Sequence, residues 1–179
     1  RALDSRQGGG RELLAYKGIA EGVENSNFLV HTSRGYFILT LYERRVAAKD
    51  LPFFLALMEH LHGRGITCPQ PVKDRNGEVL GKVAGRPAAV ITFLDGMWIR
   101  RPSAAHCAAL GEALAKLHLA GLDFRGKRAN ALSVEGWRHL YEHCCKRANE
   151  VQRDLQPLLA AELAHLEGAW PRRLPQGVI

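Results

Sequence analysis

One stretch near the amino terminus combines residue types that could bind a chain of phosphates. Residues 21–27 read Glu-Gly-Val-Glu-Asn-Ser-Asn. Glycine and asparagine tolerate unusual backbone angles, and serine and asparagine offer short polar groups. A loop of this composition between two antiparallel strands can lay backbone N–H groups over phosphate oxygens. An ordinary long hairpin loop is the alternative, and composition alone does not separate the two.

The residues on either side of this loop have the pattern of an antiparallel sheet. We expect strands at Leu13–Ile19, Phe28–Thr32 and Tyr36–Tyr42, because apolar and β-branched residues alternate or cluster there. Ser33–Gly35 is a short turn between the second and third strands. The sequence therefore predicts that the candidate loop joins the first two strands of a sheet.

A helix is expected to follow, beginning at about Leu51. Asp50 could cap its start, Pro52 is compatible with a first helical turn, and Gly63 and Gly65 would end it. Apolar residues recur at the helical period, namely Leu51, Phe54, Leu55, Met58 and Leu61. This face should pack against the sheet.

More strands should follow the helix. Asn76-Gly77 is a strong hairpin signal, Arg86-Pro87 is expected to turn the chain again, and Ala88–Leu94 reads as a buried strand. The order of three strands, one helix and two or three strands indicates an α+β lobe with one helix packed on a mostly antiparallel sheet.

From Ser103 onward the pattern is helical. Ser103 should cap a helix with an apolar stripe of Cys107, Leu110, Leu114 and Leu117. Ser133 should cap a second helix over Glu135 to about Val151, and Asp154 should open a third, which turns Leu155, Leu158, Leu159, Leu163 and Leu166 inward. We expect a flexible stretch at 1–12, a small lobe at 13–96 and a partial helical lobe at 97–179.

Composition limits the classes of partner. The chain has 179 residues, 46% of them hydrophobic and 24% charged, which is typical of a soluble globular protein. Its net charge is +7, but the basic residues are dense only in Arg125–Arg153, where seven Lys or Arg accompany three Glu. No nucleic-acid motif accompanies them, so we expect no nucleic-acid partner.

The cellular setting follows from cysteines and hydropathy. Cys68, Cys107, Cys144 and Cys145 have no C-x-x-C spacing and are expected to be free thiols of a reducing compartment. We see neither a membrane span nor a signal peptide, and expect a cytoplasmic protein.

Several common catalytic motifs are absent from the sequence. There is no Walker A sequence, no zinc spacing of Cys and His, no H-E-x-x-H pair and no G-x-S-x-G elbow. His118 lies beside an apolar helical stripe, where a packing or capping role is the ordinary one.

Longer segments of the chain resemble bacterial homoserine kinases, of the type related to aminoglycoside and choline phosphotransferases. The resemblance covers nearly the whole chain from about Leu13. Its segments are Gly18–Phe28, Tyr36–Glu43, Leu51–Leu55, Cys68–Val72, Gly85–Gly96, Ala105–His118 and Arg128–Trp137. It implies a protein-kinase-like fold, with a small antiparallel sheet lobe and an incomplete helical larger lobe.

The resemblance also implies which residues bind a nucleotide. The phosphates of ATP would be covered by Gly22, Val23, Glu24, Asn25, Ser26 and Asn27. Thr92, Phe93 and Leu94 would meet the adenine, within a segment that resembles the hinge between the lobes, although a linker between lobes or a simple turn at Asp95 would need similar residues.

One departure from the wider family concerns charge. Related kinases carry on the third strand a Lys that contacts the phosphates and pairs with a Glu on the next helix. The matching position here is Thr40, which can hydrogen-bond a phosphate but brings no charge. Arg44, Arg45 or Lys17 could supply the charge. Glu59 is the candidate helix Glu, and without a Lys partner we interpret it as a surface residue.

A second departure concerns catalysis. The family's catalytic base and its magnesium ligands belong to a His-x-Asp-x-x-x-x-Asn loop and a later Asp. Residues 174–179 resemble the strand that leads into that loop. We therefore expect no catalytic and no metal-binding residue in this chain, Mg²⁺ ligands beyond its end, and no kinase activity from the chain alone.

The resemblance implies the transfer of the γ-phosphate of ATP to the side-chain hydroxyl of L-homoserine, on the route to threonine. One alternative is a kinase for another small alcohol, such as an aminoglycoside, choline or a sugar. Another is a non-catalytic binding module whose basic 125–153 stretch contacts a polyanion. Because the leucine face of residues 155–166 would lack cover, we also hypothesise self-association as a homodimer.

Overall fold

The computed structural model describes residues 12–20, 25–43, 47–130, 132–171, 173 and 177. It divides into two compact units. The first runs to Gly126 and the second spans Lys127–Gln176. The division that the sequence suggested, at about residue 96, stays a prediction about the lobes of the family, whereas helix α2 (Ala104–Gly121) belongs to the same unit as the sheet in this structure.

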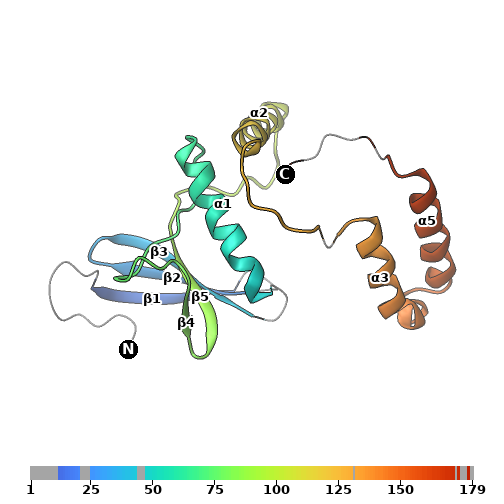
Figure 1. Cartoon of the computed structure of the whole chain (residues 1–179), viewed down its shortest axis with the longest axis horizontal. Coiled ribbons are helices and arrows are strands. Elements are labelled where there is room, and N and C mark those ends of the chain that lie inside the picture. The colour runs from blue at the N-terminus through green and yellow to red at the C-terminus, as the bar shows by residue number, and fades with distance from the viewer. Residues whose placement is uncertain are drawn as a thin grey trace. The chain divides into compact units, whose positions relative to one another are not determined.

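A five-stranded antiparallel sheet dominates the first unit (Figure 1). Its strands are β1 (Leu13–Ile19), β2 (Asn25–Thr32), β3 (Gly35–Tyr42), β4 (Gly81–Val83) and β5 (Arg86–Thr92). The spatial order is β1-β2-β3-β5-β4, so the first three strands form a meander and β5 adds to the far side of β3. This sheet with its helices confirms the predicted α+β fold.

The turns agree only in part with the sequence patterns. The turn after Thr32 is as predicted: Gly35 has a φ of 110°, and the Thr32 hydroxyl donates to its carbonyl at 3.0 Å. Asn76-Gly77 also turns the chain, and the Asp74 carboxylate accepts the N–H groups of Asn76 and Glu78.

The turn predicted at Arg86-Pro87 is wrong. Both residues lie in β5, opposite Val83 and Lys82. The chain instead turns one step earlier, at Ala84 and Gly85, whose φ angles are 50° and 77°. Two successive left-handed residues make the tight hairpin that suits the twist of paired strands. Pairing of β5 with β3 begins only at Ala88, so Pro87 lies in the strand without interrupting that ladder and did not mark the turn.

Helix α1 (Leu51–Gly63) begins and ends where the sequence predicts. The predicted cap is wrong, however, because Asp50 has a helical backbone and makes no side-chain capping bond. A 3-10 helix, η1 (Ala48–Asp50), leads directly into α1 and removes the extended residue that a cap requires.

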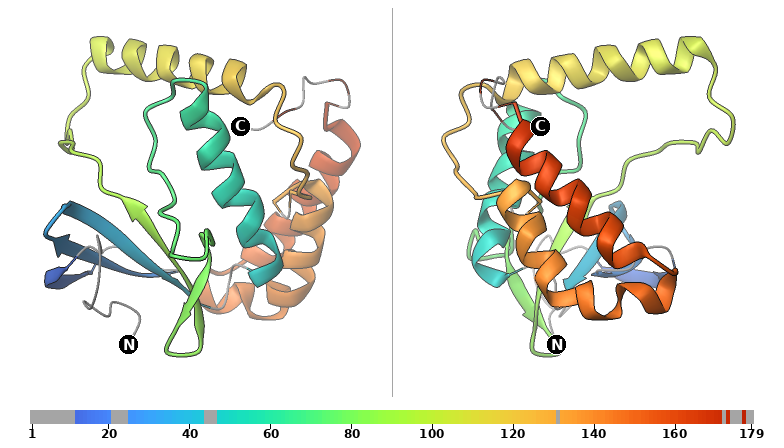
Figure 2. Two further views of the ribbon diagram at one scale, coloured as in Figure 1. Left: turned by 60° about the vertical axis from the view of Figure 1, so that its left-hand side comes forward. Right: turned by 90° about the vertical axis from the view of Figure 1, so that its right-hand side faces the viewer.

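The core of the first unit lies between α1 and the sheet. Leu51 and Leu55 are completely buried, with exposures of 0% and 1%. Figures 1 and 2 show α1 lying over one face of the sheet. The buried apolar residues of the strands are Val30, Phe37, Leu41 and Ala88 on one face of the sheet and Ala89 on the other. Burying each of the two leucines of α1 contributes about 2 kcal/mol to the stability of the unit.

Helix α2 (Ala104–Gly121) begins with the predicted cap. The Ser103 hydroxyl accepts the N–H of His106, and the Ser103 N–H donates to Nδ1 of His106, which completes a reciprocal capping box. Most of the apolar stripe is exposed within the described part of the chain, and Leu110 and Leu114 are 61% and 45% accessible.

The second unit is helical. It contains α3 (Val134–Cys144), the 3-10 helix η2 (Cys145–Arg147), α4 (Ala148–Val151) and α5 (Leu155–Ala169). The Ser133 hydroxyl caps α3 as predicted. The predicted unbroken helix from Glu135 to Val151 is wrong, because η2 divides it. Helix α5 begins directly after Asp154, as predicted, although Asp154 has a φ of 62° and makes no side-chain capping bond.

Contacts between α3 and α5 hold this unit together. Arg138 pairs with Glu167, and the rings of Trp137 and Trp170 meet edge to face at 5.2 Å. Of the leucines expected to face inward on α5, Leu163 is buried, whereas Leu158 remains 54% exposed. No helix in the described residues has the length and apolar character needed to cross a membrane.

Candidate functional site

The structure shows part of the predicted phosphate-binding loop as strand. Gly22, Val23 and Glu24 lie outside the described residues. Residues 25–27 belong to the start of β2, where they pair with residues 42, 41 and 40 of β3. The expectation that residues 25–27 lie in the loop is therefore wrong, since β2 begins three residues before Phe28. Polar side chains at the start of a strand have fixed directions, so they can form a preorganised site.

Asn27 and Thr40 are directly opposite each other and share one face of the sheet. The Thr40 hydroxyl donates to Oδ1 of Asn27 at 2.9 Å, and Thr40 is buried. This bond leaves the amide –NH₂ of Asn27 as a donor toward anything bound on this face. Ile19 of β1 and Ala89 of β5 lie in the same row, so an apolar residue is next to the polar pair on each side.

Asn25 lies two residues from Asn27 and therefore on the same face. Its Oδ1 is buried and has no hydrogen-bond partner among the described residues. Burial of Tyr42, opposite Asn25 in β3, raises the pKa of its phenol. A buried polar oxygen without a partner is costly, which makes Asn25 a candidate for a bond to a ligand or to water.

Ser26 points to the opposite face and joins a second polar group. Its hydroxyl donates to Oε1 of Glu43 at 2.8 Å, and the same oxygen accepts from the guanidinium of Arg86. These three residues tie the ends of β2, β3 and β5 together. Sequence reasoning missed the group because Glu43 and Arg86 are 43 positions apart.

The segment after β5 contains the residues predicted to meet an adenine. The polar groups of Thr92, the last residue of β5, already make hydrogen bonds within the chain. Its N–H donates to the carbonyl of Gln70 and its hydroxyl accepts the Gln70 N–H, both at 2.9 Å. The Phe93 N–H donates to the carbonyl of Tyr36 at 3.4 Å. The Leu94 N–H has no partner within the described part of the chain, so Leu94 has the backbone group best able to meet a base.

The charged candidates are scattered. Lys17 is exposed on β1, opposite Leu29, and Arg44 and Arg45 lie outside the described residues. Glu59 is half-exposed and 3.8 Å from Lys73, as a surface residue would be. Across the described ranges, no three His, Cys, Asp or Glu side chains gather to hold a metal ion.

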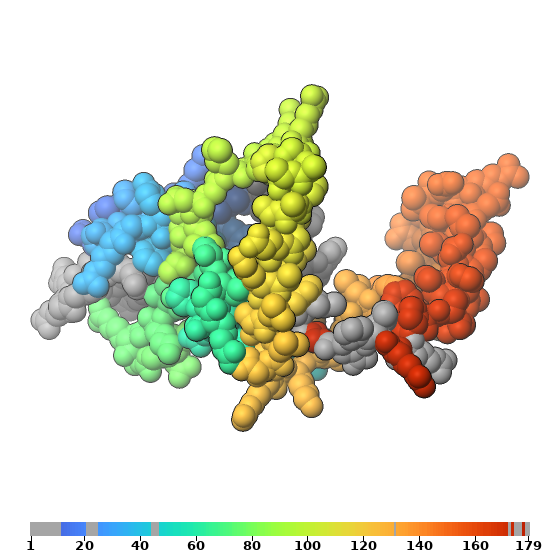
Figure 3. Space-filling view, turned by 90° about the horizontal axis from the view of Figure 1, so that it is seen from above, coloured from blue at the N-terminus to red at the C-terminus, as the bar shows by residue number. Residues whose placement is uncertain are grey.

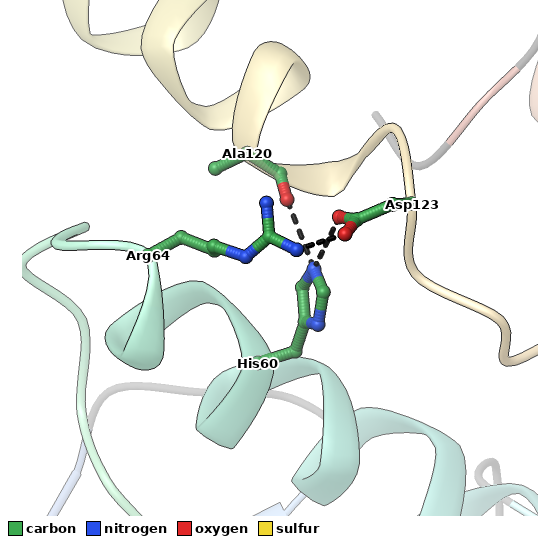
Figure 4. A network of polar contacts seen from close by, with 4 residues as sticks. All are labelled: His60, Arg64, Ala120 and Asp123. Atoms are coloured by element: carbon green, nitrogen blue, oxygen red, sulfur yellow. Dashed lines mark hydrogen bonds and ion pairs between the residues drawn. The ribbon is translucent and has the colours of Figure 1, made fainter.

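A further polar cluster, not predicted from the sequence, joins the ends of two helices (Figure 4). His60 lies in α1 and Arg64 directly follows the last residue of α1, whereas Ala120 and Asp123 come from the end of α2 and the turn after it. Nε2 of His60 donates to the Ala120 carbonyl at 2.9 Å and lies 3.2 Å from the Asp123 carboxylate. Arg64 also pairs with Asp123. We call these four residues the α1–α2 junction.

Comparison with known proteins gives the relatives of this chain. Homoserine kinase from Rhodopseudomonas palustris (strain HaA2) is 66% identical over 168 residues, and homoserine kinase from Afipia carboxidovorans is 68% identical over 168 residues. Each match covers 94% of this chain and 52% of the relative. The chain therefore spans about half the length of these curated relatives.

Solved structures give the fold. A spectinomycin phosphotransferase, solved with ADP and spectinomycin, has a TM-score of 0.56 at 13% identity, over 88% of this chain and 50% of that one. A putative fructosamine-3-kinase from Thermobifida fusca has a TM-score of 0.50 at 19% identity, over 94% of this chain and 62% of that one. The sheet, α1 and the following helices therefore have the fold of these phosphotransferases.

A family model confirms the resemblance seen in the sequence. The model described as the phosphotransferase enzyme family matches residues 15–179 of the chain, which includes the polar face of β2 and β3, the segment after β5 and the α1–α2 junction. The chain belongs to the phosphotransferase enzyme family.

Proposed function

We propose that this chain forms the nucleotide-binding part of a homoserine kinase, which transfers the γ-phosphate of ATP to the side-chain hydroxyl of L-homoserine on the route to threonine. The observation that carries this proposal is the 66–68% identity, over 94% of the chain, to relatives named homoserine kinase. Identity at this level across the sheet and both units favours a shared nucleotide and a shared acceptor.

The polar face of the sheet supports ATP as the nucleotide. The Asn27 amide is held by Thr40, and its –NH₂ has no partner among the described residues, so it can donate to a phosphate oxygen. The Leu94 backbone can pair with the adenine. In this proposal Gly22, Val23, Glu24 and Asn25 complete the cover over the phosphates, and Ser26 contributes its backbone only, because its hydroxyl bonds Glu43 on the other face. Phe93 and Thr92 then position Leu94 through their bonds to Tyr36 and Gln70.

We propose that Mg²⁺ accompanies ATP and that its ligands lie outside the described residues, as the resemblance implies. The described residues offer no cluster of carboxylates that fits the ion. When bound, Mg²⁺ neutralises charge on the phosphates. The role of this chain is then to hold the nucleotide, and the proton acceptor for the homoserine hydroxyl is also expected elsewhere.

A different alcohol acceptor is the second candidate, because the solved structures with this fold include a spectinomycin phosphotransferase. The fold alone does not choose the acceptor. The observations give less support to a binding module for a polyanion, since several basic side chains of residues 125–153 already have acidic partners. These pairs are Arg138 with Glu167, Arg147 with Glu150 and Arg153 with Asp154.

We also propose a cellular location and an oligomeric state. A cytoplasmic location fits the four cysteines, all free in the structure. A homodimer fits the exposed leucines of α5, among them Leu158 and Leu159. Sedimentation at two protein concentrations tests the dimer, and a mass that stays at the monomer value would contradict it.

The experiment is an acceptor panel with the full-length gene product. ADP release is measured with ATP and Mg²⁺ in the presence of L-homoserine, choline or spectinomycin, and without acceptor. We expect release that depends on L-homoserine and saturates with it. Turnover with choline or spectinomycin but not with L-homoserine would replace the acceptor, and turnover with none of them would overturn the assignment.

A further inference from the structure

The α1–α2 junction closes the end of a helix. Ala120 lies in the last turn of α2, where carbonyl oxygens have no partner inside the helix. Nε2 of His60 supplies that partner at 2.9 Å. Arg64, the residue that directly follows α1, pairs with Asp123 beyond the end of α2. Cationic or N–H donor groups are favourable at this end because the helix dipole is negative there.

An aromatic layer beneath the polar groups extends the contact. The ring of Phe124 is 5.2 Å from His60 and 5.5 Å from Phe53, both on α1. The Phe53 ring is also 5.5 Å from Phe54. The contact therefore runs along about two turns of α1, and the space-filling view shows α2, in yellow, lying directly against green α1 (Figure 3).

This contact is what orients α2 on the sheet. The covalent connection between them, residues 93–103, runs clear of α1 (Figure 2) and is exposed along its length, with Met97 92% and Trp98 82% accessible. Such a segment limits distance but not angle. At its other end α1 is fixed in the core through Leu51 and Leu55. A shift of α2 would therefore be transmitted to the sheet through α1.

We propose that His60, Arg64 and Asp123 are positioning residues that align α2 with the nucleotide-binding face of the sheet. This inference rests on the proposed function, because alignment matters only if the nucleotide on the sheet must meet groups held by the helical part. The three residues touch neither nucleotide nor acceptor in this account. Their loss should lower kcat more than it weakens ATP binding, because Asn27 and Thr40 are untouched and only the coupling between the nucleotide and the end of α2 is lost.

The burial of each side chain indicates how much His60, Arg64 and Asp123 each contribute to holding α2 in place. The side chains of Arg64 and Asp123 are 48% and 53% exposed, and an ion pair between exposed groups is weak. His60 is only 21% exposed and contacts both the helix end and the Phe124 ring. His60 should therefore matter most, Asp123 next because it serves both partners, and Arg64 least.

The test uses the full-length gene product and the variants His60→Phe, Asp123→Asn and Arg64→Met. His60→Phe keeps an aromatic ring against Phe124 but removes the donor to Ala120. The matched control is His62→Phe, at an exposed position on the same helix. We expect His60→Phe to lower kcat about tenfold and to raise the KM for ATP by no more than about twofold, because small misplacements of reacting groups are costly and the coupling to bound ATP is lost. His62→Phe should leave both constants unchanged.

Two further measurements distinguish a positioning role of the junction from a role in stability alone. The reciprocal variant Arg64→Asp with Asp123→Arg should regain part of the kcat lost by Asp123→Arg alone. A kcat of His60→Phe equal to wild type would overturn the inference. So would a loss of kcat that only tracks the fraction of folded protein in thermal melting.

Hydrogen exchange keeps this test distinct from the test of the proposed function. If the wild type turns over no L-homoserine, the proposed function fails, and the junction is judged with ATP alone. ATP should slow amide exchange in the last turn of α2 in wild type and in His62→Phe, but not in His60→Phe. An ATP effect that is identical in His60→Phe and wild type, or absent from wild type, contradicts the junction as a coupling element.

Discussion

Gly126→Ala should destabilise the first unit, although glycine-to-alanine changes often stabilise proteins. A Cβ at position 126 would lie 2.5 and 2.6 Å from two carbons of the Phe124 ring and 3.2 Å from a carbon of Phe53. Ordinary contacts between carbon atoms are about 3.5–4.0 Å, so the ring must move by about 1 Å. Phe124 contacts both Phe53 and His60, so it cannot move without disturbing the α1–α2 junction.

The magnitude follows from two opposing terms. Overpacking of this kind costs about 1–3 kcal/mol. The lower entropy of the unfolded chain with alanine offsets about 0.4–1 kcal/mol of that cost. We therefore expect a net loss of about 1–2 kcal/mol in the free energy of unfolding, measured by urea denaturation.

The same substitution at Gly111 is the control. Gly111 lies inside α2, and an added Cβ would meet nothing within 4 Å. Gly111→Ala should raise stability by up to about 1 kcal/mol, since alanine has the higher helix propensity. Removing the ring with Phe124→Ala should abolish the penalty of Gly126→Ala. A Gly126→Ala variant as stable as Gly111→Ala would refute the packing described around Phe124.

Two further predictions concern a helix cap and a buried phenol. Ser103→Ala removes the cap of α2, so it should lower the free energy of unfolding by about 1 kcal/mol and reduce the helicity seen by circular dichroism. Ser103→Asp, which keeps a capping oxygen, should retain most of that stability and helicity. Equal losses in both variants would contradict the cap. Burial raises the pKa of Tyr42 above the ordinary tyrosine value of 10.0. Above that pH the unfolded phenol ionises while the folded one keeps its proton, so stability falls as the pH rises through the folded pKa. Tyr42→Phe should therefore lose less stability than wild type above pH 10 in urea denaturation, and parallel profiles would refute this.

Local patterns in the sequence predicted the elements that local chemistry determines. The apolar period together with Gly63 and Gly65 predicted α1 at about its observed bounds, and Ser103 and Ser133 marked the starts of α2 and α3 because their hydroxyls cap these helices. Asp50 and Asp154 directly precede helices, as expected, but neither makes a side-chain capping bond, for a backbone reason. One continues a 3-10 helix and the other is left-handed, and neither state is visible in residue type.

Contacts between distant residues could not be predicted in this way. Glu43 meets Arg86 and His60 meets Asp123 only because β3 pairs with β5 and α1 crosses α2. The early start of β2 has a similar cause, since pairing with β3 extends the strand into polar residues that alone favour a loop. Tertiary pairing thus outweighed the turn preference of Asn25 and Asn27.

The central claim is that this chain binds ATP on the polar face of β2 and β3, and calorimetric titration of ATP into the chain tests it most directly. Thr40→Val is compared with Thr32→Val, because both threonines are buried in the sheet but the Thr32 hydroxyl bonds within the turn before β3. We predict saturable binding that weakens about 2–10-fold in Thr40→Val, the value of one hydrogen bond, and stays unchanged in Thr32→Val. No binding by the wild-type chain, or equal affinity in both variants, would contradict the account.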